Sequence, residues 1–324
     1  MKSLKFLLFS ALVILLFLIP VFVDNLYWIS VFTKWWIYIL LTVSFWLIMS
    51  TGQVNLAHAG FAAIGGYISG ALVQSYGWNS WAALPVGVLT AGLIALVLGY
   101  ITLRITGIYF IIMSVALAGF IQTIFGIWDH PFGGLVGLQS LPHPDAFLGI
   151  NLSSRPALYY LILICMLLVV ILVYRIYYSS MGRIFRGINS SDRLAEHVGI
   201  DIMKYKVMVF VIGCLCAGLG GVLFTYYTST IVPTSFTLTQ STYYIVYCAV
   251  GGLLVFPGPI IGTLVLCYIS ELIKAYAEYQ NIIFSVLLIA AMLLFKGGLY
   301  GLYQRFINWI SHVTKRNETP VKSI

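Results

Sequence analysis

Long apolar runs recur along almost the whole chain, and they constrain its fold more than any other feature. A helix needs about 20 predominantly apolar residues to cross the hydrocarbon core of a bilayer. The runs cover Phe6–Val23, Trp35–Ser50, His58–Tyr76, Trp81–Leu103, Ile108–Trp128, Ala157–Tyr174, Val207–Thr228, Tyr243–Phe256, Ile260–Ile273 and Ile282–Tyr303. The sequence therefore predicts an all-α polytopic membrane protein of about ten transmembrane helices, with residues 1–324 forming one transmembrane domain.

The composition excludes soluble classes of protein. Only 8% of the 324 residues are charged and 61% are hydrophobic, so polar side chains are too few to cover a soluble core. The net charge of +8 comes from residues between the apolar runs, without the basic stripe typical of nucleic-acid binding, and we expect no nucleic-acid partner. The five cysteines lie within apolar runs without metal-site spacing, so we expect no metal.

The positions of the basic residues orient the predicted spans. With the N-terminus in the cytoplasm, only Lys34, Arg155 and Lys274 fall outside, and Lys296 lies within a span. The other thirteen lie inside: Lys2, Lys5, Arg104, Arg175, Arg183, Arg186, Arg193, Lys204, Lys206, Arg305, Lys315, Arg316 and Lys322. Because cytoplasmic loops are enriched in Lys and Arg, we expect both termini, including a tail at about 304–324, in the cytoplasm.

The most polar segment is a predicted cytoplasmic loop at about 175–206. A short helix is expected within it, because Ser191 or Asp192 can cap the first turn and Gly199 suits the left-handed conformation that ends many helices. Such a helix either docks onto a partner or lies in the membrane interface, and the pattern alone leaves both interpretations open.

Apolar and basic residues divide the surface of this loop. Leu194, Ala195 and Val198 predict one apolar face for the short helix. In the stretch before it, Arg183 and Arg186 are expected to face anionic lipid or a partner.

Three strong hydrogen-bonding side chains lie within an otherwise apolar region. Gln53, Asn55 and His58 lie in or next to residues 51–57, which interrupt a long hydrophobic stretch. An unpaired polar group at membrane depth costs several kcal/mol. These side chains therefore either line a solute path or hold helices together by hydrogen bonds.

The sequence lacks motifs for catalysis and nucleotide binding. No lysine has the glycine pattern of a phosphate-binding loop, and no nucleophile–base arrangement or intramembrane pair of carboxylates is present. We therefore expect a protein that is not an enzyme, with no catalytic residues. If ATP drives it, another chain hydrolyses the ATP.

Three segments resemble the permeases of branched-chain amino acid ABC importers, of the LivM type. Residues 51–72 read TGQVNLAHAGFAAIGGYISGAL, like the family signature between the second and third helices. Residues 179–224 read SSMGRIFRGINSSDRLAEHVGIDIMKYKVMVFVIGCLCAGLGGVLF, like its cytoplasmic coupling segment, and residues 249–266 read AVGGLLVFPGPIIGTLVL, like its glycine-rich segment near the C-terminus. The resemblance implies a transport subunit in a prokaryotic cytoplasmic (inner) membrane.

The resemblance also implies partners and a mechanism. In such importers two permease chains form the pathway, two cytoplasmic ABC ATPase subunits contact the coupling helices, and a periplasmic or extracellular solute-binding protein delivers the solute. It implies a second permease, of the LivH type, beside this chain and membrane lipid around it. No cofactor is expected on this chain, since ATP is used by the partner subunits to drive alternating access.

Site residues are carried over from the matching positions. The resemblance places on the substrate pathway Gly52, Gln53, Asn55 and His58, and in the outer loop Gly133 and Gly134. It assigns to ATPase coupling Arg183, Arg186, Ser191, Asp192, Arg193, Leu194, Ala195, Glu196, Val198 and Gly199.

Two alternatives remain at the level of sequence. Urea and short-amide ABC permeases are close relatives, and polar groups such as Asn55 suit an amide as well as the ends of a zwitterion. The other alternative is a secondary carrier or facilitator that acts alone, without ATPase partners.

Overall fold

The computed structural model describes residues 14–22, 25–144, 154–253, 255–274, 286 and 301. Within them the secondary structure is helical and no strand is present, which confirms the all-α prediction. The chain divides into two compact units, residues 1–241 and 242–324, and each is described by itself. That residues 1–324 form one transmembrane domain stays a prediction.

Long helices make up most of the first unit. In chain order they are α2 (Leu26–Met49), α3 (His58–Tyr76), α4 (Ser80–Thr102), α5 (Ile108–Ile127), η1 (Gly134–Val136), α6 (Arg155–Tyr178), α7 (Ser180–Ser190), α8 (Asp192–His197), α9 (Ile202–Thr228) and η2 (Pro233–Phe236). Helix α10 (Leu238–Gly251) begins at its end, and α11 (Pro257–Ile273) lies in the second unit.

Polar caps, rather than the edges of hydropathy, set where several helices begin. Helix α3 occupies the predicted range residue for residue. Helix α2 starts nine residues earlier than predicted, at Leu26, because the side chain of Asn25 accepts a hydrogen bond from the Tyr27 N–H at 2.9 Å. Helix α9 starts at Ile202 instead of Val207, because Asp201 caps its first turn. The predicted starts of these two spans are therefore wrong.

Five helices are long and apolar enough to cross a membrane: α2, α4, α5, α6 and α9. Only the described residues enter that number, and α11 is a shorter apolar helix. The first predicted span, Phe6–Val23, is described only at residues 14–22, which are helical. The last span, Ile282–Tyr303, lies outside the described residues except at positions 286 and 301, and the tail at 304–324 lies wholly outside them.

Helix α4 exposes apolar side chains on the surface of the first unit. Leu89, Leu93 and Leu96 are each at least half exposed. Helix α2, by contrast, is mostly buried. An apolar helix with an exposed apolar face suits a lipid environment, where no polar covering is needed.

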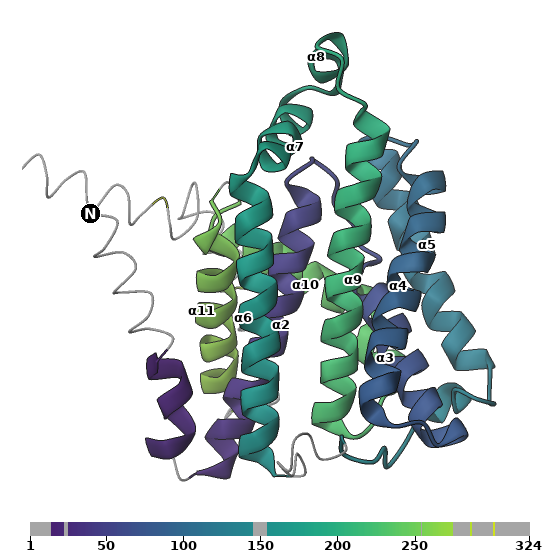
Figure 1. Ribbon diagram of the computed structural model, residues 1–324, viewed down its shortest axis with the longest axis vertical. Coiled ribbons are helices and arrows are strands. Elements are labelled where there is room, and N and C mark those ends of the chain that lie inside the picture. Colours follow the sequence, from purple (N-terminus) through teal and green to yellow (C-terminus); the bar gives the residue numbers. More distant parts are fainter. Residues whose placement is uncertain are drawn as a thin grey trace, which may run out of the picture. The chain divides into compact units, whose positions relative to one another are not determined.

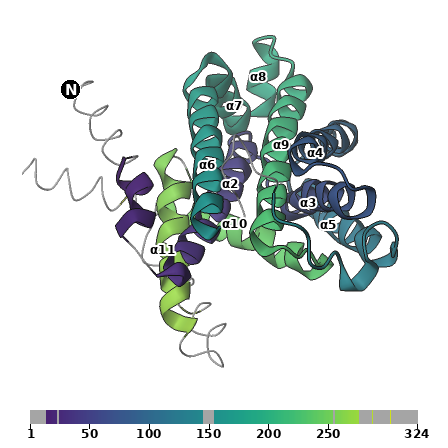
Figure 2. The ribbon, with the colours of Figure 1, turned by 60° about the horizontal axis from the view of Figure 1, so that its bottom comes forward.

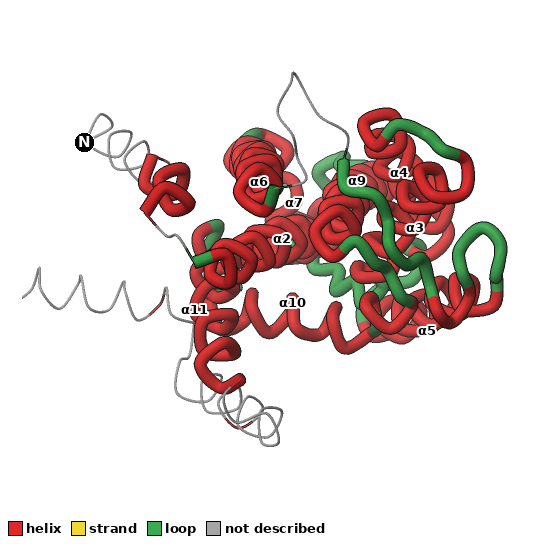
Figure 3. The backbone as a smooth tube through the Cα atoms, turned by 90° about the horizontal axis from the view of Figure 1, so that it is seen from below, coloured by secondary structure: helices red, strands yellow, loops and turns green. Residues whose placement is uncertain are grey.

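Helix α9 is the centre of the first unit. It packs against α2, α3 and α4, while α6 packs on α2 and α5 packs on α3. Figure 1 shows α9 between α2 and α6 on one side and α3 and α4 on the other, and Figure 3 shows the same neighbours from below.

Small residues allow α3 and α9 to approach until their backbones touch. A Cβ atom on Gly221 would overlap the backbone of Ala62, and one on Gly65 would overlap the backbone of Gly218. Small residues repeat at four-residue spacing in both helices. This pattern is typical of helices that pack closely in lipid, where the hydrophobic effect does not drive helices together.

The two ends of the first unit differ in structure. At one end α7 and α8 connect α6 to α9, and α8 forms the tip in Figure 1. At the other end η1 and η2 lie beside a single antiparallel bridge between Leu138 and Ile231. Figure 2 gives the same arrangement from a tilted view, with α7 and α8 together beyond α6.

Glycines also bring α10 and α11 together in the second unit. A Cβ on Gly251 would overlap the carbonyl of Gly258, and one on Gly262 would overlap the carbonyl of Tyr247. Helix α11 begins at Pro257, a first-turn position where the missing N–H is tolerated. The apolar runs Tyr243–Phe256 and Ile260–Ile273 predict two short helices here, and two are present. Their predicted bounds are wrong, because α10 ends at Gly251 and α11 already begins at Pro257.

Candidate functional site

The predicted pathway motif begins as a non-helical link between α2 and α3. Gly52 takes a left-handed conformation, with φ of +81°. The side-chain oxygen of Asn55 accepts a hydrogen bond from the Ala57 N–H at 3.1 Å, and the Leu56 N–H donates to the Ser114 hydroxyl of α5 at 3.1 Å. These bonds satisfy backbone groups that a helix would otherwise pair, so the link has a defined non-helical conformation.

His58 opens α3 and is fully buried. Its Nε2 lies 3.0 Å from the hydroxyl of Ser44 in α2, and that hydroxyl donates its proton to the Leu41 carbonyl at 2.9 Å. The ring also meets Phe45 edge to face, at 5.5 Å between centroids. His58 thus connects α3 to α2 by a hydrogen bond and an aromatic contact.

Asn55 offers the clearest polar group of the motif for a solute. The residue is buried, and among the described residues nothing accepts a hydrogen bond from its side-chain nitrogen. Gln53, two residues earlier, is also buried. A buried donor without a protein acceptor is costly, and a passing solute or a water molecule can satisfy it.

Gly133 and Gly134 lie apart from the rest of the predicted pathway residues. They form a tight turn after α5 with φ of +79° and +57°, and their loop meets the C-terminal end of α3, where Gln74 donates to the Gln139 carbonyl at 3.0 Å. The pathway motif of residues 52–58 meets the opposite end of that helix. Since α3 has 19 residues, the two groups are separated by about 28 Å of helix.

Helix α7 packs its apolar residues inward. Phe185 and Ile188 are buried, and Arg183 is exposed. Arg186 is half-buried; its guanidinium donates to the Tyr177 carbonyl at 2.9 Å and lies over the Tyr177 ring. Arg186 therefore connects α7 to the end of α6, a contact that the sequence did not predict.

Helix α8 has the ends that its sequence predicts. The Ser191 side chain accepts a hydrogen bond from the Leu194 N–H at 3.3 Å, as an N-cap. Gly199 has a φ of +80°, its N–H donates to the Glu196 carbonyl, and the next N–H donates to the Ala195 carbonyl. A short helix with both ends satisfied keeps its shape without a partner.

The apolar residues of α8 do not share one face as predicted. Ala195 is buried against the protein, whereas Leu194 and Val198 are 69% and 76% exposed. Arg193 and Glu196 are also exposed. The helix thus presents two aliphatic side chains flanked by both signs of charge, a composition that fits a protein contact better than bulk water.

An ion pair that sequence reasoning missed connects α8 to α9. The Lys206 Nζ lies 2.6 Å from the Asp192 Oδ2, with 3% and 37% of the two side-chain surfaces exposed. Lys206 is part of a basic run at the predicted membrane boundary, which is usually solvated. No local spacing reveals the pair, because its members are 14 residues apart.

The coupling segment also contacts the pathway motif. Gly52 lies against Asn189 of α7, so that a Cβ atom at Gly52 would come within 2.9 Å of the Asn189 side-chain oxygen. Residues at one end of the first unit therefore connect the exposed α8, through α7, to the link that contains Asn55.

These residues can bind and transmit movement, and they do not suggest a covalent step. Among the described residues no group of three His, Cys, Asp or Glu side chains has the geometry of a metal site. The described polar residues of the pathway motif are donors and acceptors of hydrogen bonds. A neutral or zwitterionic solute suits such groups.

The family model that matches the chain is described as the permease component of branched-chain amino acid transport systems, and the match covers residues 27–295. The chain is 24% identical to the high-affinity branched-chain amino acid transport system permease protein LivM of Escherichia coli strain K12, over 82% of this chain and 68% of that protein. It is 26% identical to the LivH permease protein of Salmonella typhimurium strain LT2, over 77% of this chain and 86% of that protein.

A more distant organism provides a third relative. The probable branched-chain amino acid transport permease protein LivH of Methanocaldococcus jannaschii is 22% identical, over 78% of this chain and 84% of that protein. No solved structure matches the chain.

Proposed function

The chain belongs to the family of permease components of branched-chain amino acid transport systems, and from this premise we propose that it is the transmembrane permease subunit of an ABC importer for branched-chain amino acids. Relatives named LivM and LivH support this function, since both are named as permease proteins of such systems. Five helices long and apolar enough to cross a membrane support the location of the subunit in a membrane.

The subunit works in an assembly of several chains. A second permease of the LivH type completes the pathway, two cytoplasmic ABC ATPase subunits hydrolyse ATP, and a periplasmic or extracellular solute-binding protein delivers the amino acid. Similarity of this one chain to both LivM and LivH supports a pairing of two related permeases. This chain then needs no cofactor of its own.

The subunit has about ten spans in the prokaryotic cytoplasmic membrane, with both termini in the cytoplasm. The distribution of Lys and Arg supports this orientation. It puts α7 and α8 on the cytoplasmic side, where ATPase subunits are found, and the loop that holds Gly133 and Gly134 on the outer side.

Helix α8 is the surface on which an ATPase subunit docks. The exposure of Leu194 and Val198 is the observation that carries this proposal, since two large aliphatic side chains project from a helix whose shape is already fixed. Burying a Val or Leu side chain contributes about 1.5–3 kcal/mol. Arg193 and Glu196 beside them select the partner by charge.

Movement of the docked helix changes the side of the membrane from which the solute pathway is open. When the ATPase subunits close, α8 carries α9 with it through the Asp192–Lys206 ion pair, and α7 displaces Gly52 through Asn189. The link that holds Gln53 and Asn55 then moves between inward-open and outward-open arrangements. His58 keeps α3 on α2 during this change.

The docking proposal is tested on the importer purified from its membrane. In the double variant Leu194→Ser/Val198→Ser, two apolar contacts are lost, and we expect the ATPase recovered per permease to fall at least tenfold, since about 3 kcal/mol corresponds to more than a hundredfold in affinity. Copurification is measured by quantitative mass spectrometry of the tagged permease.

A matched control lies at the opposite end of the first unit. Leu135 and Val136 are 83% and 68% exposed, so Leu135→Ser/Val136→Ser removes similar apolar surface from the outer side and should leave ATPase recovery unchanged. Normal recovery from the α8 variant would refute docking at this helix. Leucine uptake into liposomes without ATPases, ATP or binding protein would instead refute the importer.

A further inference from the structure

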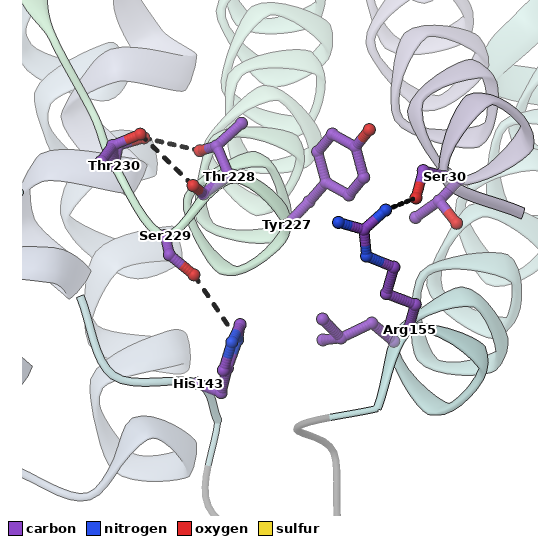
Figure 4. A pocket seen from close by; sticks show the side chains of 9 residues that line it. Ser30, His143, Arg155, Tyr227, Thr228, Ser229 and Thr230 are labelled. Carbon is purple, nitrogen blue, oxygen red and sulfur yellow. Dashed lines mark hydrogen bonds between the residues drawn. The ribbon is translucent and has the colours of Figure 1, made fainter. Parts of the chain in front are cut away.

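A polar recess lies at the outer end of the first unit, away from the pathway motif and the coupling segment. Its volume is about 550 Å³, and α2, α6, the end of α9 and the loop at His143 line it. Figure 4 shows Arg155 and Ser30 on one side of the recess and Ser229 and His143 on the other, with Tyr227 between them. The volume is typical of a site for a small solute.

Arg155 makes one side of the recess positive. It is the first residue of α6, so its charge adds to the partial positive charge of the helix N-terminus, where a cation is disfavoured unless an anion is near. Its guanidinium donates to the Ser30 hydroxyl at 2.8 Å. No carboxylate of the described residues lies within ion-pair distance of Arg155. A guanidinium has five N–H donors, and a carboxylate can accept two of them at once.

The opposite side of the recess is the C-terminal end of α9, which carries partial negative charge. The helix ends at Thr228. The Thr228 hydroxyl donates to the Thr230 carbonyl at 2.6 Å, and the Thr230 hydroxyl donates to the Thr228 carbonyl at 3.3 Å. Ser229 between them has a left-handed conformation with φ of +54°, a strained state for a residue with a side chain. Carbonyls at a helix C-terminus attract a cation such as an ammonium group.

Apolar groups complete the recess. Leu158, one turn into α6, is buried in its wall, and the ring of Tyr227 forms another part of the lining. A positive helix end, a negative helix end and an apolar wall are the three features that a zwitterionic amino acid with an aliphatic side chain would need.

We propose that this recess is an outer binding site for a zwitterionic aliphatic amino acid, with its carboxylate on the Arg155 guanidinium and its ammonium at the C-terminal end of α9. The proposal rests on the proposed function and deepens it, because it names the residues that meet the solute on the outer side. The aliphatic side chain packs on Leu158 and Tyr227. No bond is made or broken in this step.

The site is tested by direct binding of radiolabelled L-leucine to the purified importer in lipid nanodiscs, without binding protein or nucleotide. Arg155→Gln removes the charge and should weaken binding about tenfold to a hundredfold, the range for hydrogen bonds to charged groups. Arg155→Lys keeps the positive charge but loses the paired N–H donors of the guanidinium, so its affinity for leucine should lie between those of the unsubstituted protein and Arg155→Gln. Arg104→Gln, at an exposed arginine on the end of the unit that holds α8, is the matched control and should bind leucine as the unsubstituted protein does.

A competitor without a carboxylate isolates the carboxylate contact. Leucinol is such a competitor, because it keeps the ammonium and the side chain of leucine but lacks the carboxylate. For the unsubstituted importer, leucinol should compete with the radiolabelled leucine at least tenfold less well than unlabelled leucine does. For Arg155→Gln, leucinol and unlabelled leucine should compete about equally well, because this variant already lacks the group that binds the carboxylate. If leucinol competes as well as unlabelled leucine for the unsubstituted importer too, the assignment of the carboxylate to Arg155 is overturned.

The outcomes distinguish this site from the importer function. If the unsubstituted importer transports leucine but Arg155→Gln binds leucine normally, the recess is not a solute site and the proposed function stands. If Arg155→Gln changes only the affinity for the loaded binding protein, Arg155 meets an acidic side chain of that protein, and the solute site is also overturned. If the unsubstituted importer transports no leucine, the proposed function itself fails.

Discussion

At the scale of single residues, hydrogen bonds to three serines position the pathway motif. The hydroxyls of Ser44, Ser114 and Ser241 contact His58, the Leu56 N–H and the Ala59 N–H respectively. In lipid the chain cannot exchange such bonds for bonds to water, so each of them restricts the motif more than it would on a soluble protein. The motif is therefore held from three neighbouring helices, while Asn55 keeps a donor available.

The ion pair between α8 and α9 leads to an asymmetric prediction. Asp192→Ala leaves the buried ammonium of Lys206 without its partner and should cost about 3 kcal/mol, whereas Lys206→Met leaves a carboxylate that is 37% exposed and should cost about 1 kcal/mol. The apparent unfolding temperature is measured in detergent from the loss of monodispersity of the purified protein on heating, and it ranks the variants by stability.

Combining the two changes tests the reason for that order. Asp192→Ala/Lys206→Met should be no less stable than Lys206→Met alone, since no buried charge then lacks a partner. Lys204→Met is the control, because Lys204 is an exposed neighbour, and it should leave the unfolding temperature unchanged. Equal losses from both single variants would contradict the role given to burial.

At the scale of elements, the sequence predicts those features whose signals are local. The cap at Ser191, the left-handed Gly199 and the range of α3 all follow from short patterns, and all are present. The partner of Lys206 and the role of Arg186 do not follow, because each depends on a turn of the chain that brings distant residues together. The start of α2 at Leu26 does not follow from hydropathy, because a hydropathy pattern does not show that Asn25 caps the helix.

The candidate site was predictable in type but not in arrangement. The resemblance names both Asn55 and Gly133 as pathway residues, yet a whole helix separates them. The recess at Arg155 has no pattern in the sequence, because its lining comes from four separate segments and its charge looks like an ordinary loop arginine. Only the packing of α2, α6 and α9 creates it.

The backbone contact of α3 with α9 predicts a strong effect of one methyl group. Gly221→Ala would place a Cβ on the Ala62 backbone, which cannot move aside as a side chain can, and should destabilise the protein by about 2–3 kcal/mol. Unfolding of the purified chain in detergent, with sodium dodecyl sulfate as denaturant, measures the loss.

A glycine in open space provides the control for this substitution. Nothing lies within 4 Å of a Cβ built on Gly119 of α5, so Gly119→Ala gains helix propensity and should be neutral or more stable by up to about 1 kcal/mol. A loss in Gly119→Ala as large as that in Gly221→Ala would mean that helix glycines matter here for a reason other than close packing.

At the scale of the whole molecule, the proposed orientation predicts which residues are reached from outside the cell. Leu135→Cys should react with a membrane-impermeant maleimide on intact spheroplasts, and Glu196→Cys only after permeabilisation, because the two exposed positions lie at opposite ends of the first unit. Gel shift of the labelled chain is the measurement.

The unsubstituted chain serves as the background for this labelling. Four of its five cysteines are buried and Cys165 is half-buried, so little reaction is expected without a new thiol. Labelling of both introduced cysteines from the same side would reject the orientation and, with it, the docking of cytoplasmic ATPases on α8.

The interlocked backbones of α3 and α9 have a consequence for biosynthesis. Helix α3 ends at Tyr76 and α9 begins only at Ile202, which is 126 residues later (202 − 76). At translation rates of about 5–20 residues per second, roughly 6–25 s pass between the synthesis of α3 and that of the α9 surface that covers Gly65 and Gly66. During that interval this face of α3 can meet only lipid, other early helices or an insertion factor, so a chain that stops before Ile202 lacks the surface that normally covers it.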